Sequence, residues 1–376
     1  MTHSRTLPPG DQETSRNSTD HGYTLPSRYY LDADIFEREK EAIFYRNWHY
    51  VCHASEIDKP GDYVTTRVAD EQLFVIRGHD GELRGFYNVC RHRAHQLLQG
   101  SGNTRTIVCP YHAWSYTTSG ELGYARNAEN VDGFDPTQFC LPQVKVELFL
   151  GFVFINLDLK SDSLAARVPG LEKDIRARIP ELDSMTVKAK AEFGGIEINA
   201  GWKVVIDNYV ECYHCSPAHI DFASIIDMSA YRMETFEGWS RQLGPTIRNE
   251  NSAYTLPQQS NRQVSSAFWY LWPNITFNVL PGSPNLSVLT ILPIEPGKTS
   301  FIGDQLGTSD FDPNDDRMAY LANTLGPEDQ ALCESVQRGL GSRGYDQGLF
   351  MVDREKSGIA EHAVHQFHSM VLAALN

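Results

Sequence analysis

The sequence lacks any long apolar segment. Its longest apolar run, Leu148 to Ile155, is far shorter than the roughly 20 residues that a helix needs to cross a bilayer. Residues 1–22 are polar and have no apolar stretch of the kind found in secretion signals, so we expect them to form a mobile arm. These absences argue against a membrane partner and favour a cytoplasmic protein.

Basic residues are few. The chain holds 33 Lys and Arg against 48 Asp and Glu, which gives a formal net charge of −15. A surface of this sign repels phosphate backbones, so the composition argues against nucleic acid as a partner. The same charge favours, if anything, a cationic substrate.

The cysteines number seven, an odd count that is unlike the dense, even framework of a small disulfide-rich domain. We therefore expect reduced thiols or metal ligands. Cys212 and Cys215 form a C-x2-C pair, but the pair lies at the end of a predicted helix rather than at a helix start. For that reason packing is favoured over a thiol redox pair or zinc binding.

The length of 376 residues predicts two domains, since single cores rarely grow beyond about 250 residues. The pattern indicates an α+β protein. Residues 23–47 read as a helical lead-in, with a helix over 32–48, and short β-rich runs in 48–160 predict an all-β domain. Residues 161–376 mix strands and helices.

Three helices are predicted in the second domain. One lies near residues 170–179, and the chain from Pro327 to the C-terminus reads as helical. The sequence GWKVVIDNYVECYHC, residues 201–215, has apolar residues every three or four positions and predicts one amphipathic helix that Pro217 should end.

Two Cys/His pairs stand in the β domain. Cys90-x-His92 is followed, after sixteen residues, by Cys109-x2-His112. Two cysteines with two histidines fit either a structural zinc site or a two-iron two-sulfur cluster in which imidazoles bind one iron. A zinc finger groups its cysteines together, whereas each pair here mixes one thiolate with one imidazole. The spacing therefore favours the iron–sulfur cluster.

A second group of metal-ligand residues lies on the predicted helix 201–215. Asn208, Glu211 and His214 recur every three residues and should share one face, and His219 follows beyond Pro217. Two imidazoles and one carboxylate on one side of Fe(II) leave positions open for dioxygen and substrate. The pattern predicts a mononuclear non-haem iron site.

The two groups together resemble the oxygenase (alpha) component of the Rieske non-haem iron oxygenases, from about residue 25 to the C-terminus. The segment DNYVECYHCSPAH, residues 207–219, and the segment EDQALCESVQRGLGSRGYDQG, residues 328–348, are most similar to the quaternary-ammonium branch, which includes the carnitine monooxygenases. Most of the family has Asp where Glu211 stands. The resemblance implies a helix-grip catalytic domain with an antiparallel sheet.

The resemblance also implies site roles. His214, His219 and Asp329 would hold the iron, with Glu328 and Asp353 as weaker candidates for the third ligand. Glu211 would not be a ligand but would carry electrons from the cluster histidine His112 of a neighbouring subunit, which implies a homotrimer.

A quaternary ammonium ion cannot be neutralised by losing a proton, so its usual protein partner is a set of aromatic faces. Candidates lie near the iron ligands and in the run FWYLWPNITF, and they are Tyr209, Tyr213, Phe268, Trp269, Tyr270, Trp272 and Phe277. Only alternate residues of a strand share a face, so at most about half of 268–272 can contribute. A substrate carboxylate would need an Arg that the sequence does not single out. The histidines at 362, 365 and 368 have helical spacing and are expected on a solvated or partner-facing surface.

The resemblance implies an NAD(P)H-dependent monooxygenase in which a flavin/2Fe-2S reductase supplies electrons. The present chain has no glycine-rich dinucleotide fingerprint, so NADH and flavin would lie on that partner. Carnitine would give trimethylamine and malic semialdehyde. Alternatives are N-demethylation of glycine betaine, proline betaine or choline-like compounds, a ring-hydroxylating dioxygenase alpha subunit acting on an aromatic acid, and a pure electron carrier.

Overall fold

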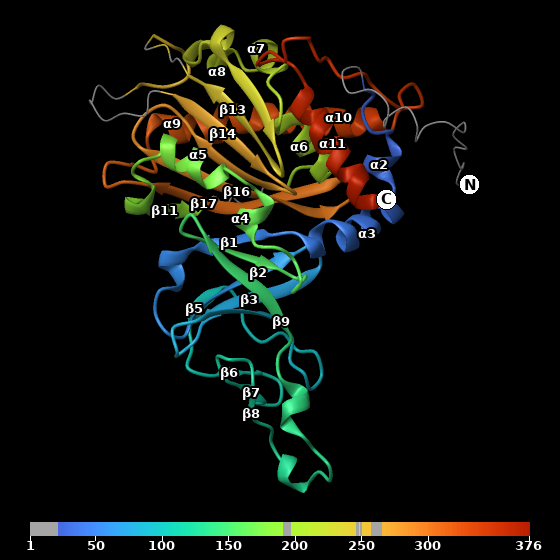
Figure 1. The fold of residues 1–376 in the computed structure, drawn as a ribbon, viewed down its shortest axis with the longest axis vertical. Helices are drawn as coiled ribbons and strands as arrows, with labels where there is room; N and C mark the ends of the chain where they lie inside the picture. Colours follow the sequence, from blue (N-terminus) through green and yellow to red (C-terminus); the bar gives the residue numbers. More distant parts are fainter. Residues whose placement is uncertain (1–21, 191–196, 246–247, 249, 257–264) are drawn as a thin grey trace.

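The computed structural model describes residues 22–190, 197–245, 248, 250–256 and 265–376. The arm predicted for residues 1–22 therefore lies outside the described residues, except for Gly22. The described chain forms two sheet-based domains that follow one another along the long axis of the molecule (Figure 1). No described helix is both long and apolar enough to cross a bilayer.

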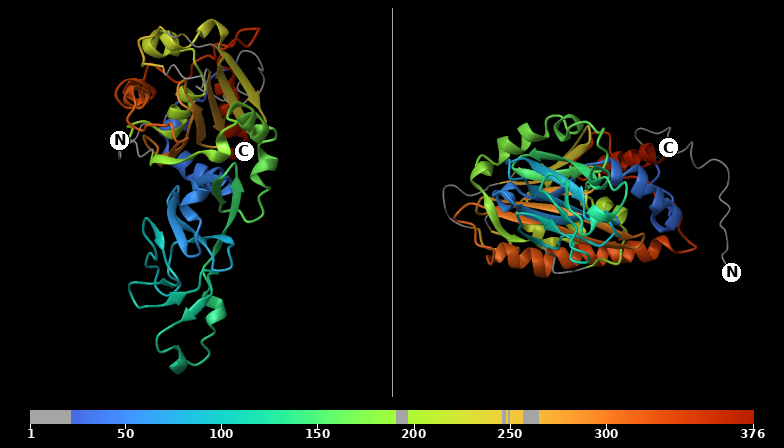
Figure 2. Two further views of the ribbon diagram at one scale, coloured as in Figure 1. Left: turned by 90° about the vertical axis from the view of Figure 1, so that its left-hand side faces the viewer. Right: turned by 90° about the horizontal axis from the view of Figure 1, so that it is seen from below.

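The first domain is built on a seven-stranded antiparallel sheet with the order β1-β10-β9-β4-β3-β2-β5. A small sheet, β6-β7-β8, lies at the end of this domain that points away from the second domain (Figures 1 and 2). The strands are β1 (His49–His53), β2 (Asp62–Val68), β3 (Glu71–Arg77), β4 (Leu83–Tyr87), β5 (Ser101–Asn103), β6 (Ile107–Val108), β7 (Ser115–Tyr116), β8 (Leu122–Tyr124), β9 (Gln143–Phe149) and β10 (Phe152–Asn156).

The second domain is built on another seven-stranded antiparallel sheet, with the order β11-β17-β16-β15-β14-β13-β12. Its strands are β11 (Thr186–Lys190), β12 (Arg232–Phe236), β13 (Trp239–Gly244), β14 (Ser266–Leu271), β15 (Ile275–Val279), β16 (Asn285–Glu295) and β17 (Lys298–Gly307). The sheets and helices form the predicted α+β architecture.

The helices of the described chain are α2 (Arg28–Leu31), α3 (Ala33–Ala42), α4 (Leu164–Arg167), α5 (Leu171–Arg178), α6 (Trp202–Tyr209), α7 (Cys215–Ala218), α8 (Ile220–Ile225), α9 (Asp316–Tyr320), α10 (Gly326–Leu340) and α11 (His362–Leu375). The helix predicted near 170–179 is confirmed as α5. Helices α6, α10 and α11 contact one another or the second sheet on one face. Helix α5 packs on the other face.

Strand β14 shows how side chains divide between the two faces of the sheet. Successive side chains of a strand point to opposite faces. Trp269 and Leu271 join the core beneath α5, whereas Phe268 and Tyr270 point to the side of α6. The aromatic run of β14 is therefore divided between the two faces of the sheet.

The predicted helix over residues 32–48 is wrong in detail. It is divided into α3 and a 3-10 turn, Phe44–Arg46, and α2 precedes it. Helix α3 contacts α11, and its Glu39 is fully buried, where it accepts the indole N–H of Trp202 at 2.8 Å and pairs with Lys203. These bonds tie the lead-in to α6.

The single helix predicted over 201–215 is also wrong. Helix α6 ends at Tyr209, and the chain turns before α7 begins at Cys215. The carboxylate of Glu211 accepts the backbone N–H groups of Tyr213 and His214, which replaces helical hydrogen bonds in this turn. Pro217 is the third residue of the four-residue helix α7 and lies in its first turn, where a missing N–H costs nothing.

The histidines at 362, 365 and 368 do not form the solvated surface that their spacing suggested. His362 and His368 are buried, because α11 packs against α6 and α3. His368 accepts the backbone N–H of Leu25 at 3.1 Å through Nδ1, and its Nε2 lies 2.8 Å from a carboxylate oxygen of Asp207. His362 and His368 thus belong to the core, and His365 is half-buried.

The C-terminal helices begin earlier than predicted. Helices α9 and α10 are joined without a break by a π-helical turn, Leu321–Leu325, so Pro327 lies inside a longer helical segment. A π turn relaxes the hydrogen-bond pattern in which a proline ring would otherwise clash. Residues 341–361 contain no helix and lead to α11.

Candidate metal centres

The two Cys/His loops of the first domain are built alike. Cys90 follows β4 and Cys109 follows β6. In each loop the N–H of the cysteine donates to the carbonyl five residues later, and its carbonyl accepts the N–H of the fourth residue. Those fourth residues, Ala94 and Ala113, both adopt a positive φ, of 57° and 58°. This shared geometry turns both loops towards one point.

Where the two Cys/His loops meet, the cysteine thiols are more deeply buried than the histidine imidazoles. Cys90 and Cys109 are only 3% and 1% exposed, while His92 lies at the surface and its ring is 4.6 Å from that of His112. This arrangement fits a two-iron two-sulfur cluster whose imidazole-bound iron is the outer one.

Tyr116 is a residue of this centre that the sequence pattern did not reveal. Its hydroxyl lies 3.4 Å from Sγ of Cys90 and accepts the N–H of Arg91 at 3.0 Å. The hydroxyl proton is therefore free to point at the sulfur. Hydrogen bonds to cluster sulfurs are one of the means by which a protein tunes the reduction potential.

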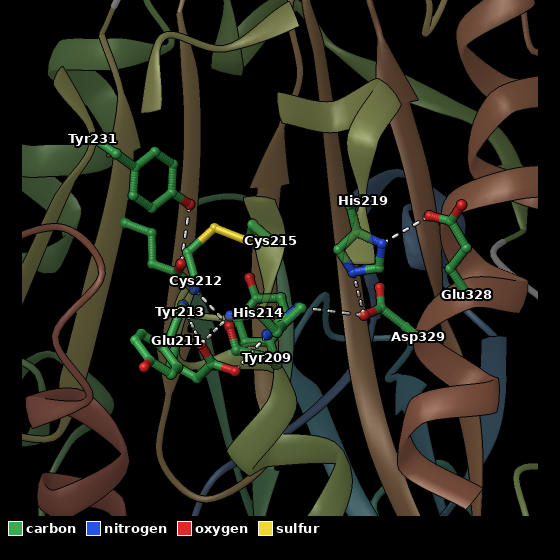
Figure 3. Close-up of a disulfide and its surroundings, with 11 residues drawn as sticks. Tyr209, Glu211, Cys212, Tyr213, His214, Cys215, His219, Tyr231, Glu328 and Asp329 are labelled. Atoms are coloured by element: carbon green, nitrogen blue, oxygen red, sulfur yellow. Dashed lines mark hydrogen bonds and ion pairs between the residues drawn. A yellow bond between two sulfur atoms is a disulfide. The ribbon is translucent and has the colours of Figure 1, made fainter. Parts of the chain in front are cut away.

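The second centre brings together His214, His219 and Asp329. One ligand atom from each lies within 4.8 Å of the others. Oδ1 of Asp329 is 2.9 Å from Nε2 of His219 and 3.7 Å from Nε2 of His214, and Figure 3 shows Asp329 reaching the histidines from α10. Two imidazoles and one carboxylate form the donor set of non-haem Fe(II) sites, so these residues fit the predicted iron.

Each histidine of this centre also contacts a carboxylate through its other nitrogen. Nδ1 of His214 contacts Glu211, and Nδ1 of His219 lies 2.7 Å from Glu328 (Figure 3). Such contacts fix the ring orientation and point Nε2 at the metal position. Burial lowers the pKa of His219, but hydrogen bonds from its ring to the carboxylates of Asp329 and Glu328 outweigh burial and raise the pKa above the ordinary value.

The two weaker candidates for the third ligand lie elsewhere. Glu328 reaches the far nitrogen of His219, so it supports a ligand instead of being one. Asp353 is exposed and binds Ser357. Asn208 is half-buried and lines the cavity next to the metal residues.

A cavity of about 260 Å³ lies next to His214, His219 and Asp329. Its aromatic lining residues come from several elements and are Tyr209, Phe222, Tyr231, Phe268 and Phe301. Its neutral amides include Asn208, Gln242, Asn278 and Gln305. Among the described residues that line it, Arg317 is the only Lys or Arg; it is 2% exposed and bonds Asp315 at 3.2 Å.

The cavity corrects the predicted aromatic cage. Of the predicted residues, Tyr209 and Phe268 line it. Trp269 and Phe277 face the opposite side of the sheet and are fully buried in the α5 core, because alternation along the strands turns them away. The remaining three do not line the cavity either: Tyr270 and Trp272 pack on Phe367, and Tyr213 is 47% exposed.

Cys212 and Cys215 are joined by a disulfide, drawn at the centre of Figure 3. The expectation of reduced thiols is therefore wrong for this pair. Both cysteines are buried and both line the cavity. The five other cysteines of the chain are free thiols in the structure.

Comparison with known families divides the chain in the same way as its two domains. Residues 47–135 match the Rieske [2Fe-2S] domain. Residues 182–376 match the catalytic domain of the ring hydroxylating alpha subunit. The first match covers the two Cys/His loops, and the second covers all three residues of the second centre.

Individual proteins are similar over almost the whole chain. The carnitine monooxygenase oxygenase subunit of Acinetobacter baumannii is 39% identical, over 94% of this chain and 95% of its own. A solved quaternary ammonium Rieske monooxygenase, described for carnitine oxidation and inter-subunit electron transfer, superposes with a TM-score of 0.89 at 37% identity, covering 98% of this chain and 99% of its own. Another, solved in complex with L-carnitine, gives 0.86 at 36% identity, covering 99% and 100%. The chain thus belongs to the Rieske non-haem iron oxygenases, as an oxygenase component with a Rieske cluster and a mononuclear iron.

Proposed function

We propose that this protein hydroxylates carnitine at the carbon next to its quaternary nitrogen, using dioxygen and electrons from a separate reductase. The observation that carries the proposal is the cavity beside His214, His219 and Asp329, which has five aromatic side chains in its wall. The similarity to proteins that oxidise carnitine supports the same substrate.

The cavity suits a cationic head group. A quaternary ammonium ion offers no hydrogen-bond donor, so it is held by aromatic faces, each giving about 0.5 to 2 kcal/mol. Phe222 and Phe268 lie 6.0 Å apart with their rings inclined by 52°, and Tyr231 lines the same cavity. The carboxylate of Glu211, which lines the cavity and is not an iron ligand, adds a negative charge. Arg317, which lines the cavity, is the candidate to bind the carboxylate of the substrate.

The reaction balances with two electrons. The substrate carbon, dioxygen, two electrons and two protons give a hydroxylated carbon and water. The carbinolamine then loses trimethylamine, which leaves malic semialdehyde. Bound iron supplies the activation of dioxygen. The chain itself places the substrate, excludes water with aromatic residues and holds both ligand imidazoles in orientation through Glu211 and Glu328.

The experiment is a turnover assay of the chain loaded with both metal centres. A flavin/2Fe-2S reductase, NADH and dioxygen are supplied, and trimethylamine and formaldehyde are measured from carnitine, γ-butyrobetaine, glycine betaine, proline betaine and choline. Trimethylamine from carnitine, matched by NADH use, is the expected result. Formaldehyde without trimethylamine would replace the proposal with N-demethylation, and no product from any of the five would overturn the substrate class.

We further infer that electrons cross between subunits of a homotrimer. In one chain the sheet β6-β7-β8, beside the cluster loops, lies at the opposite end of the molecule from α7 and α8 (Figure 1). The end of the first domain also carries exposed apolar side chains, which are Val108, Tyr111, Tyr124 and Val131. Such side chains favour contact with another protein surface.

Mixed assemblies test this inference. A Cys109→Ser chain lacks the cluster and an Asp329→Ala chain lacks the iron, so each alone should be inactive. When both are produced together, activity should return, because the cluster of one chain serves the iron of its neighbour. Mixed assemblies that stay inactive, or a mass in solution equal to that of one 42.4 kDa chain, would contradict the trimer.

A further inference from the structure

We propose that Cys212 and Cys215 form a reversible dithiol–disulfide pair that sets how firmly the segment carrying His214 retains iron. The disulfide encloses His214 within a four-residue stretch of chain. The carnitine reaction has no use for this pair. The inference does not depend on which amine is the substrate.

The position of the pair allows small molecules to reach it. The side chains of Cys212 and Cys215 are 2% and 5% exposed, so a protein oxidoreductase cannot dock on them. Both line the cavity beside the metal residues, which connects them with whatever enters the cavity. A small oxidant or reductant is therefore the fitting reagent.

The segment between the two cysteines is held on several sides. The N–H groups of Tyr213 and His214 donate to Glu211, and the N–H of Cys215 donates to the carbonyl of Cys212 at 3.2 Å. The disulfide closes this turn covalently. In this oxidised state the ligand atoms of the iron site already lie within 4.8 Å of one another. The oxidised state is therefore compatible with iron binding.

Reduction must change this geometry. Bonded sulfur atoms are about 2 Å apart, and two thiols cannot remain that close. Reduction removes the covalent link that closes the turn, so the backbone on both sides of His214 is freer to move. Metal–ligand distances tolerate changes of only about 0.2 Å, so a shift of this turn should loosen the bond from His214 to iron.

The redox steps balance with simple reagents. Oxidation joins the two thiols through an S–S bond while hydrogen peroxide takes up their two electrons and two protons to become two waters. Peroxide is the two-electron reduction product of dioxygen, which the proposed reaction brings to the same cavity. In the reverse direction a phosphine and one water give two thiols and a phosphine oxide.

Iron retention with a parallel measurement of thiol state tests the proposal. Iron-loaded full-length protein is kept with or without a phosphine, an Fe(II) chelator is added, and loss of the mononuclear iron is followed. The visible absorption of the Rieske cluster reports that the first domain stays intact. Digestion and mass measurement show whether Cys212 and Cys215 are linked.

The untreated protein should carry the disulfide, and phosphine should speed iron loss by about tenfold, which is the lower range of effects seen when support of a metal ligand is removed. The double variant Cys212→Ser/Cys215→Ser should lose iron as fast as the reduced protein and should not respond to phosphine. Cys333→Ser is the matched control, because Cys333 is a buried free thiol that lines the same cavity.

Two results would overturn the proposal. One is the presence of two free thiols at these positions after treatment with peroxide. The other is the same rate of iron loss in the oxidised, reduced and double-variant proteins. Neither readout uses carnitine. An unchanged rate of iron loss would therefore not contradict the proposed carnitine reaction, and a failed turnover assay would not contradict the role of the disulfide.

Discussion

Glu211 contacts His214 twice, through Nδ1 of the imidazole and through the backbone N–H, and it also accepts the backbone N–H of Tyr213. One carboxylate therefore ends the helix and orients an iron ligand. Its side chain keeps 11% of its surface exposed. A group on the outside of the molecule can thus reach a residue that touches the iron ligand directly.

Replacement of Glu211 by Gln should stop electron transfer while both metal centres stay filled. An amide preserves the shape but lacks the charge that draws and orients a neighbouring imidazole. Reoxidation of the pre-reduced Rieske cluster, on mixing with dioxygen and carnitine, should slow by about 100-fold or more. Glu361→Gln is the control, because it removes a nearby acid that contacts neither iron-site histidine. An unchanged reoxidation rate in Glu211→Gln would rule out the bridging role.

Glu328 and Asp329 should respond differently to loss of charge. Asp329→Asn removes a direct iron ligand and should abolish mononuclear iron. Glu328→Gln leaves the ligands in place but weakens the contact that orients His219, so iron affinity should fall by about 10- to 100-fold. Iron titration of the two variants checks this order. Equal affinity in Glu328→Gln and the unaltered chain would show that the contact is dispensable.

Phe268→Leu should raise the KM for carnitine. Loss of one aromatic face costs about 0.5 to 2 kcal/mol, which corresponds to about a 2- to 30-fold increase. Trp272→Leu should leave the KM unchanged, because Trp272 packs on Phe367 and does not line the cavity. Steady-state kinetics of the pair separate the cavity observed in the structure from the cage that the sequence suggested. A raised KM in Trp272→Leu with an unchanged KM in Phe268→Leu would instead support the aromatic cage predicted from the sequence.

His49 should make stability depend on pH. Burial lowers its pKa to about 4, and in the unfolded chain the pKa returns to about 6.5. As pH falls from 6.5 to 4, the unfolded chain takes up a proton that the folded chain resists, so stability is lost over this window. The loss amounts to about 3 kcal/mol.

Denaturant unfolding at pH 7, 5.5 and 4.5 measures this loss. His49→Gln removes the titrating ring, so the apparent free energy of unfolding should fall less steeply with acid than in the unaltered chain. Parallel curves for the two proteins would show that His49 does not carry the dependence.

Some of the site could be predicted from sequence because its chemistry restricts residue type and spacing. The two Cys/His loops and the pair His214 and His219 are of this kind. The phase of β14 could not be predicted in this way. Either Phe268 or Trp269 could face the cavity, and only the packing of α5 against the sheet decides.

Tertiary contacts also overruled local patterns. Apolar spacing continues past Tyr209, yet the carboxylate of Glu211 captures N–H groups and ends the helix. The role of Glu328 depends on the approach of His219 from a segment more than 100 residues earlier in the chain, which no local pattern contains. His368 is buried because α11 packs where its ring meets Asp207 of α6, and its own sequence neighbours do not reveal this contact.

The π-helical turn Leu321–Leu325 has a consequence for the register of the iron site. A π turn takes up about one more residue than an α-helical turn, and successive residues of an α-helix point about 100° apart. Deletion of one residue there would restore a regular helix and rotate α10 by more than a quarter of a turn relative to α9. Asp329 would then point away from both histidines. The extra residue of the π turn thus sets the rotation of α10, so that Glu328 and Asp329 contact the two ring nitrogens of His219.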